Sequence, residues 1–352
     1  MERRSPASDL AGQVESRFRR GRPEPEESPP AETTSVISTG STLLDLAISG
    51  DRFPEGGVPG GILVEIFGPS GCGKTVLLCE MAGNVQRLGG EVLFRDPEGR
   101  LNTQFAELFG FRVENADYSM PDTVTELFDP ISKWEPPASG NIHGVFADSL
   151  AALSTKMEMA DGDKYGMRRA KEFSESCRKV CRLFPTRNIV MVCSNQVRQN
   201  PDAGPFQEKY TTPGGEAIKF YASVRLRCHS PMRLTMERKV GGRDLKRAQG
   251  VRTTVDVAKN SVSSPYRSAE VNILFAYGID DLRGNLEFLK ASLGLPSFNV
   301  LGDEVRLGTS IDRAIREVEE GDLQARLKAR TIEVWHDVES RFRVERRPKV
   351  RE

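Results

Sequence analysis

The stretch that decides the fold is Ile62-Leu63-Val64-Glu65-Ile66-Phe67, followed by Gly68-Pro69-Ser70-Gly71-Cys72-Gly73-Lys74-Thr75 and then Val76-Leu77-Leu78. The apolar run predicts a buried strand, and the residues from Lys74 onward predict the first turn of a helix. The turn between them matches the phosphate-binding pattern G-x-x-x-x-G-K-[ST], which requires a strand before it and a helix after it. An ordinary glycine turn is the alternative, and the strand-turn-helix context favours a nucleoside triphosphate site.

Each residue type in this turn has a physical role in binding phosphate. Glycine can take backbone angles that side chains forbid, so successive N–H groups can point at phosphate oxygens. The helix that begins at Lys74 adds the positive end of its dipole. The Lys74 ammonium would neutralise the β- and γ-phosphates, and the Thr75 hydroxyl would bind Mg²⁺. The predicted nucleotide-binding residues of the turn are Gly68, Pro69, Ser70, Gly71, Cys72, Gly73, Lys74 and Thr75.

The composition limits the other classes of protein. The 352 residues can bury a large core, and 50 Lys and Arg balance 50 Asp and Glu, so the net charge says nothing about an anionic partner. Six cysteines without a C-x-x-C pair are typical of reduced core thiols in a cytosolic protein. No uninterrupted apolar run approaches the length of a membrane span. We therefore expect a cytoplasmic protein that neither enters a membrane nor is secreted.

Strand and helix patterns alternate after the first strand. Apolar runs at residues 91–96, 144–148 and 188–193 predict three further strands with helical stretches between them. This alternation predicts an α/β fold with a mostly parallel central sheet covered by helices, and with the ligand at the carboxyl ends of the strands. Later segments are closer together and predict strands added at one edge, partly antiparallel. These segments are 223–227, 253–257 and 270–275.

The two ends of the chain differ in pattern from this core. Leu10, Val14 and Phe18 form one helical stripe, which precedes a linker rich in Pro, Glu and Ser. A hairpin pattern at 298–307, followed by a helical pattern, predicts a small C-terminal α+β domain. The predicted parts are an N-terminal helix, a flexible linker, the nucleotide-binding core, the C-terminal domain and a basic tail. Their bounds are 1–19, 20–34, 35–284, 285–343 and 344–352.

Three polar side chains follow predicted strands at the edge of the sheet where the phosphate-binding turn lies. Asp148 stands where the carboxylate that holds the water shell of Mg²⁺ is expected, although an isolated Asp could equally cap a helix. Glu98 could orient and deprotonate an attacking water, or could be a solvated loop glutamate. Gln196 could sense the γ-phosphate and pass its presence to the polar loop at 199–215. A loop of this length without periodicity is usually functional or disordered.

The segment after this loop carries a family resemblance. Gly214-Gly215-Glu216-Ala217-Ile218-Lys219-Phe220-Tyr221-Ala222-Ser223-Val224-Arg225-Leu226 resembles the signature of the bacterial RecA recombinase family, with Ile218 where leucine is usual. The similarity runs from Gln13 to Gly302 and implies a RecA-like P-loop NTPase core. Further motifs of the family occur in the same order. They are Ser38-Thr39-Gly40-Ser41 with Leu44-Asp45, residues 64–69, Asp148-Ser149-Leu150-Ala151-Ala152-Leu153 and Asn195-Gln196-Val197-Arg198.

The resemblance implies roles for residues around the nucleotide. Glu98 matches the catalytic glutamate, and Gln196 matches the glutamine that couples the γ-phosphate to DNA binding. Phe105 falls where a tyrosine stacks on adenine, and Asn102 replaces an aspartate near the adenine. Lys259 matches one of two lysines that reach the γ-phosphate of the neighbouring protomer. The implied catalytic set is Lys74, Glu98, Gln196 and Lys259, with Thr75 and Asp148 as metal ligands.

The resemblance also implies two DNA-binding loops. Arg198 and the loop from Phe206 to Gly215 match the second loop, with Phe206 on its inserted aromatic. Residues 164–178 match the first loop and the helix after it. The N-terminal helix resembles one that docks on the adjacent protomer. The candidate DNA contacts are Lys171, Ser174, Arg178, Arg198, Phe206, Thr211, Thr212, Gly214 and Gly215.

Several features depart from the family pattern. Ser261 stands where the second lysine is usual, so one cation at the protomer interface is missing. The first loop is shorter than usual and carries Arg168-Arg169. The C-terminal tail is basic where tails of the family are typically acidic. Residues 233–252 are strongly basic, which is typical of a solvated hairpin and equally suits contact with a DNA duplex.

Together the motifs and the resemblance imply an ATP- and Mg²⁺-dependent recombinase. Such a protein forms a helical homo-oligomeric filament on single-stranded DNA and pairs that strand with homologous duplex DNA in DNA repair. One alternative is a RecA-like paralogue that acts as a DNA-binding mediator with weak ATPase activity and no strand exchange. Ser261 and the altered first loop favour this alternative. A third possibility is an NTPase that acts on no nucleic acid, which the loop around Phe206 disfavours.

Overall fold

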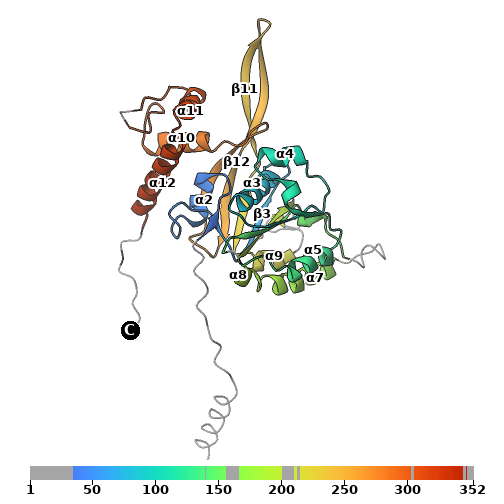
Figure 1. The fold of residues 1–352 in the computed structure, drawn as a ribbon. Coiled ribbons are helices and arrows are strands. Elements are labelled where there is room, and N and C mark those ends of the chain that lie inside the picture. Colours follow the sequence, from blue (N-terminus) through green and yellow to red (C-terminus); the bar gives the residue numbers. More distant parts are fainter. Residues whose placement is uncertain are drawn as a thin grey trace, which may run out of the picture. The chain divides into compact units, whose positions relative to one another are not determined.

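In the computed structural model, the apolar run before the phosphate-binding turn forms β3 (Leu63–Gly68), and all its residues are buried. β3 lies inside a ten-stranded sheet (Figure 1). On one side of β3 the neighbours run parallel to one another out to the edge of the sheet. In order they are β7 (Ile189–Gln196), β6 (His143–Ala147), β4 (Val92–Arg95) and β5 (Asp117–Ser119).

The structure describes the chain from residue 35, with gaps. The described residues are 35–138, 140–155, 166–199, 210–211, 215–302, 305–343 and 346. The predicted N-terminal helix and linker lie outside them, as does the basic tail except Arg346. Within the described part of the chain, no helix is long and apolar enough to span a lipid bilayer.

The other side of the sheet changes from parallel to antiparallel pairing. β10 (Val224–Cys228) pairs parallel to β3 and antiparallel to β12 (Arg243–Asn260). Beyond β12 lie β13 (Ser268–Leu274) and β14 (Gly278–Ile279), both antiparallel. The predicted α/β fold with a mostly parallel sheet and partly antiparallel edge strands is therefore confirmed.

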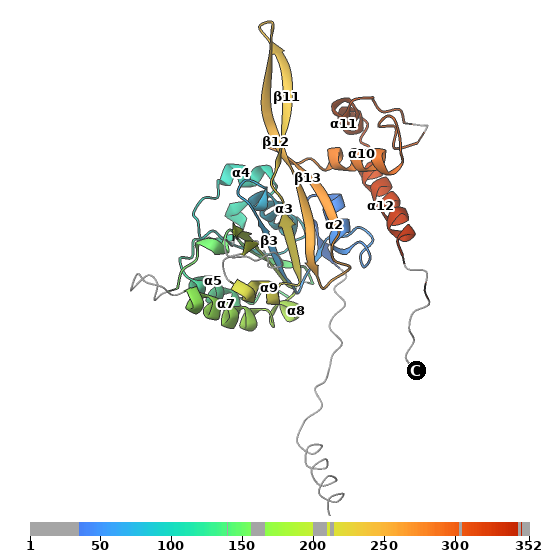
Figure 2. The ribbon, with the colours of Figure 1, turned by 180° about the vertical axis from the view of Figure 1, so that it is seen from behind.

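Helices cover both faces of the sheet, as predicted. Alternate strand residues point to opposite faces, so Val64 and Ile66 of β3 lie in one core while Leu63 lies in the other. The first core contains α2 (Thr42–Ser49), α3 (Lys74–Arg87) and α4 (Thr103–Leu108). The second contains α5 (Val124–Lys133), α7 (Gly166–Val180), α8 (Phe184–Arg187) and α9 (Gly215–Tyr221). Figures 1 and 2 show α3 and α7 on opposite sides of β3.

Short elements complete this part of the fold. β1 (Val36–Ile37) pairs with β2 (Val58–Pro59), and β8 (Arg198–Gln199) pairs with β9 (Tyr210–Thr211). The single-turn helices η1 (Val113–Asn115) and η2 (Leu150–Ala152) follow α4 and β6 in the chain. Among the described strands, β11 (Met232–Val240) pairs with β12 alone and forms a hairpin with it. The basic run at 233–252 therefore lies in a hairpin, as the first of its two sequence interpretations expected.

The C-terminal part is helical. It contains α10 (Asp281–Ser292), α11 (Ile311–Glu320) and α12 (Gln324–Arg341), which share a core of their own. The predicted hairpin at 298–307 is wrong, because the described residues there form turns and no strand. A side chain holds this segment instead, since Oδ1 of Asn299 accepts a hydrogen bond from the Leu307 amide at 2.7 Å. The predicted boundary after residue 284 lies inside α10.

Candidate nucleotide site

The phosphate-binding turn joins the end of β3 to the start of α3. Gly71 and Gly73 have φ angles of 75° and 93°, in the left-handed region that favours glycine. A Cβ atom at Gly73 would lie 2.3 Å from Cδ1 of Ile273, so a larger residue there would also have to displace the end of that side chain. No described side chain caps α3. The first backbone N–H groups of α3 can therefore donate hydrogen bonds to an anion, as the sequence pattern requires.

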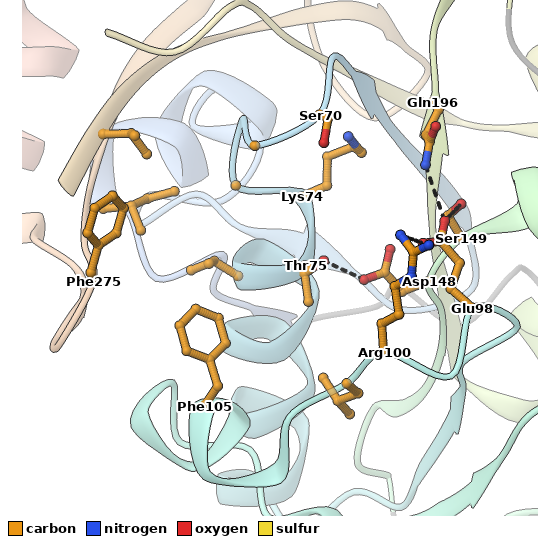
Figure 3. A pocket seen from close by; sticks show the side chains of 16 residues that line it. Ser70, Lys74, Thr75, Glu98, Arg100, Phe105, Asp148, Ser149, Gln196 and Phe275 are labelled. Carbon is orange, nitrogen blue, oxygen red and sulfur yellow. Dashed lines mark hydrogen bonds and ion pairs between the residues drawn. The ribbon is translucent and has the colours of Figure 1, made fainter. Parts of the chain in front are cut away.

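A pocket of about 370 Å³ opens over this turn (Figure 3). Its polar and apolar residues are separated in the way that the phosphates and the base of a nucleotide require. Phe105 and Phe275 lie together on the side away from Glu98 and Gln196 (Figure 3). The polar side chains of the lining are Ser70, Lys74, Thr75, Glu98, Arg100, Asp148, Ser149 and Gln196, and the larger apolar ones are Leu101, Phe105, Val251, Ile273 and Phe275.

Lys74 is held over the turn by its own backbone. The ammonium donates hydrogen bonds to the carbonyl oxygens of Gly68 and Pro69, at 3.1 and 2.7 Å. It also lies 3.8 Å from Sγ of Cys72. A hydrogen bond from the Cys228 thiol, together with the charge of Lys74, lowers the pKa of Cys72 to about 7. The Lys74 ammonium therefore places a positive charge beside the turn, where it can favour an anion.

The side chains of Thr75 and Asp148 are in contact, as expected of two residues that supply oxygen ligands to one metal ion. The Thr75 hydroxyl donates to Oδ2 of Asp148 at 2.5 Å, and the Ser194 hydroxyl donates to Oδ1. Burial raises the pKa of Asp148, and the charges of Glu98 and Asp96 add to this rise. Asp148 does not cap a helix, because Ser149 occupies the N-cap position of η2. A hydroxyl and a carboxylate fit Mg²⁺, which takes its remaining ligands from phosphates and water.

Glu98 lies in the loop after β4, opposite the turn. Its Oε1 accepts hydrogen bonds from the Ser149 hydroxyl at 3.0 Å and from the Gln196 amide at 3.2 Å. Its Oε2 forms an ion pair with Arg100 at 3.1 Å. The Glu98 side chain is only 20% exposed, unlike that of a solvated loop glutamate. The two candidates that the sequence placed at different strand ends, Glu98 and Gln196, are therefore in direct contact.

The residues expected near the base differ in their surroundings. Phe105 lines the pocket, and its ring meets that of Phe109 edge to face, with centroids 4.5 Å apart. Asn102 does not line the pocket, and its Oδ1 caps α4 by accepting from the Phe105 amide at 3.1 Å. Asparagine and aspartate are both good N-caps. Asn102 thus fixes the helix that carries Phe105, the residue predicted to lie beside the base.

The described candidate DNA contacts lie on α7, on the β8–β9 pair and at the start of α9. Lys171, Ser174 and Arg178 follow one another at i, i+3 and i+7 along α7, outside its buried stripe. Arg198 of β8 lies opposite Thr211 of β9, so these two strands would form the stem of the predicted second loop. Gly215 is the first residue of α9. Phe206, Thr212 and Gly214 lie outside the described residues.

Lys259 is not among the residues that line the pocket of its own protomer. Its ammonium donates to the carbonyl oxygens of Lys219 and Phe220, at 2.9 Å each, at the end of α9. Burial lowers the pKa of Lys259, and the nearby charge of Arg225 adds to this effect. Lys259 therefore joins the helix that follows the second loop to the antiparallel part of the sheet.

Sequence reasoning missed several residues in the pocket and Ser194 behind it. Ser149 and Ser194 hold the two central carboxylates, and Arg100 pairs with Glu98. The two serines lie one or two positions from predicted site residues, so their nearness in sequence could have predicted that they hydrogen-bond to the site. Phe275, just after β13, gave no such signal, because its place depends on the order of the strands.

The fold and the site define a P-loop nucleotide-binding protein. The model of the RecA N-terminal domain matches residues 11–280. Protein RecA of Thermus thermophilus is 31% identical over 315 residues, which are 86% of each chain. Protein RecA of Streptomyces venezuelae is 35% identical over 282 residues, or 78% of this chain and 70% of the relative. Protein RecA of Halalkalibacterium halodurans is 31% identical over 355 residues, or 97% and 92%. The chain belongs to the RecA family.

Proposed function

We propose that the protein is a DNA-dependent ATPase that assembles into a helical filament on single-stranded DNA and pairs that strand with homologous duplex DNA in repair. The contact between Glu98 and Gln196 carries this proposal, since it joins the candidate base for ATP hydrolysis to the start of the second loop. Only Val197 separates Gln196 from β8, the first strand of the loop stem. Membership of the RecA family supports the same activity.

In this proposal each polar residue of the pocket has its own role in ATP binding or hydrolysis. The backbone amides of the turn and Lys74 bind the phosphates of ATP. Thr75 and Asp148 would hold Mg²⁺, and the ion would supply positive charge beside the phosphoryl oxygens. Glu98 orients the attacking water and accepts its proton, and Ser149 holds the Glu98 carboxylate in place.

Gln196 would act as the switch between nucleotide and DNA. With ATP bound, its amide reaches toward the γ-phosphate from the end of β7 and fixes the β8–β9 stem. Arg198, Phe206 and Thr211 would then contact the strand, with the other loop residues Thr212, Gly214 and Gly215. Lys171, Ser174 and Arg178 would add phosphate contacts from α7. Lys259 would complete the site of the neighbouring protomer in the filament.

A second candidate function is a DNA-binding mediator with weak ATPase activity and no strand exchange. The observation that favours it is Ser261, which supplies no cation where the family has a second lysine. The Ser261 amide donates to the carbonyl oxygen of Ser223 at 2.8 Å, so the backbone there is fixed. Its short neutral side chain would leave Lys259 as the single cation offered to the adjacent nucleotide.

ATP hydrolysis with and without single-stranded DNA tests the proposal. We expect DNA-stimulated turnover, and we expect Glu98→Gln to lower it by roughly 10²- to 10⁴-fold while ATP binding is kept. Glu107→Gln is the matched control, because this glutamate is exposed on α4 near the pocket. DNA binding with negligible turnover would support the mediator instead, and turnover indifferent to DNA would contradict both. A strand-exchange assay then decides whether pairing is retained.

A further inference from the structure

The β11–β12 hairpin is a structure that the nucleotide site does not use. β13 pairs with β12 only from Gly250 onward, so the outer part of the hairpin is a free two-stranded ribbon. Figures 1 and 2 show it projecting from the sheet. Every residue from Glu237 to Ala248 is exposed. The turn consists of Gly241 and Gly242, with φ angles of 58° and 82°, as a tight hairpin requires.

The register of the ribbon sorts its side chains into two different faces. Residues directly opposite each other share a face, and neighbours along a strand alternate. On one face Glu237 lies opposite Lys246 and Lys239 lies opposite Asp244, so charges of opposite sign are paired. The other face, here called the arginine face, carries positive charge only. It consists of Met236, Arg238, Val240, Arg243, Leu245 and Arg247.

No ion pair among the described residues neutralises the charge of the arginine face. Arg238, Arg243 and Arg247 form no ion pair with any residue that the structure describes. Each of them lies opposite an apolar residue, and Val240 and Leu245 are 58% and 43% exposed. Both acidic residues of the ribbon project from the opposite face. Such segregation has no benefit for folding in an exposed ribbon, where it leaves cations and apolar groups in water.

We propose that the arginine face binds the backbone of double-stranded DNA, with the ribbon lying along a groove. The inference deepens the proposed function, on which it rests for the nature of the polyanion. A two-stranded ribbon has the dimensions that the major groove admits. Arg243 and Arg247 are four residues apart on one strand, which separates them by about 13 Å. Guanidinium groups at this spacing can bind phosphates while Val240 and Leu245 contact sugars and bases.

The composition of the ribbon favours duplex over single-stranded DNA. Residues 232–250 contain no Phe, Tyr or Trp. Proteins that hold unpaired strands stack bases on such rings, whereas phosphate contacts to a duplex need cations alone. The face also lacks amide side chains that would read base edges. The ribbon would therefore bind duplex DNA without preference for sequence, which suits a site that holds a duplex during a search for homology.

Two double variants with the same change in net charge test this site. Arg243→Gln with Arg247→Gln removes two cations from the arginine face. Lys239→Gln with Lys246→Gln removes two from the opposite face and is the matched control. Arg238 stays intact, because it also lines a groove that contains Asp312 and Glu319. The readout is fluorescence anisotropy of a labelled duplex of about 30 base pairs with full-length protein, between about 50 and 200 mM salt.

We expect the arginine variant to bind the duplex roughly 10- to 100-fold more weakly, and the slope of log affinity against log salt to fall by about 2. The lysine variant should change affinity by less than about threefold. Equal losses in both variants, or no loss in the arginine variant, would overturn the inference. Displacement of the duplex by unlabelled oligothymidine or polyglutamate, with the same dependence on Arg243 and Arg247, would also overturn it.

ATP turnover stimulated by single-stranded DNA separates this inference from the proposed function. Turnover should be unchanged in the arginine variant, since the ribbon lies outside the pocket and the second loop. Lost duplex binding with normal turnover supports the arginine face. If single-stranded DNA does not stimulate ATP turnover by the wild-type protein, the proposed function is contradicted. A duplex affinity that still depends on Arg243 and Arg247 would nevertheless support duplex binding by the arginine face.

Discussion

At the scale of single residues, Glu80 of α3 makes stability depend on pH. Its Oε1 accepts from the Ile279 amide at a long 3.5 Å. Burial raises its pKa from 4.5 to about 7. The folded state thus binds this proton more tightly than the unfolded state. The stability that Glu80 contributes is fully present below pH 4.5 and is lost as the pH rises through about 7.

Glu80→Gln removes this dependence, because an amide cannot ionise. We expect the variant to be more stable than the wild type by about 1–3 kcal/mol at pH 8, and equally stable near pH 4. Thermal unfolding across this pH range measures the difference. Glu114→Gln is the control, since Glu114 is exposed and should change nothing. A constant difference between wild type and Glu80→Gln at all pH values would contradict the prediction.

The same scale shows what the sequence could predict of the site. Gly73, Lys74 and Thr75 were predictable because one short stretch fixes both the conformation and the chemistry. The contact between Glu98 and Gln196 was not predictable. Glu98 follows β4 and Gln196 ends β7, so the two meet only when β4, β6 and β7 stand in order. Strand order depends on long-range packing, which a local pattern does not contain.

At the scale of elements, a buried ion pair joins the three strands around the turn. Glu65 of β3 is fully buried, and its Oε2 accepts from Nε of Arg225 of β10 at 2.6 Å. Its Oε1 accepts from the Asn195 amide of β7 at 3.0 Å. The Arg225 guanidinium also lies over the Phe67 ring, 4.4 Å from its centroid. Three neighbouring strands therefore depend on one carboxylate.

Glu65→Ala should lower the free energy of unfolding by about 3–5 kcal/mol, because it leaves the Arg225 charge buried without its partner. Chemical denaturation measures this loss. The double change Glu65→Leu with Arg225→Met should recover most of the stability, since no charge then remains buried. A loss below about 1 kcal/mol in Glu65→Ala, or a double variant as unstable as the single one, would show that the pair contributes little.

The elements themselves were predictable where hydrophobic periodicity was strong. β3, β4, β6 and β7 begin and end within a few residues of their apolar runs. β5 was missed, because an edge strand with an exposed or half-buried pattern has no apolar run. The hairpin expected at 298–307 failed for the opposite reason. Its alternating apolar residues enter the core of the C-terminal helices rather than one face of a sheet.

At the scale of the whole described chain, Arg267 joins the C-terminal helices to the nucleotide-binding core. Its guanidinium forms ion pairs with Asp51, after α2, and with Glu339 of α12, each at 2.8 Å. It also lies 5.2 Å from the centroid of the Trp335 ring. One side chain thus contacts both parts, and its 18% exposure protects these ion pairs from much of the screening by salt.

Arg267→Met keeps an apolar stem beside Trp335 and removes the charge that holds Asp51 and Glu339. We expect α12 to separate from the core at a lower temperature than in the wild type, with a loss of about 1–3 kcal/mol. Trp134→Phe leaves Trp335 as the only tryptophan, so its fluorescence reports this contact. Arg330→Met is the control, because the one ion pair of Arg330 among the described residues is with Glu333 of its own helix. Equal Trp335 transitions in the two variants would mean that apolar packing against α12, and not Arg267, joins the two parts.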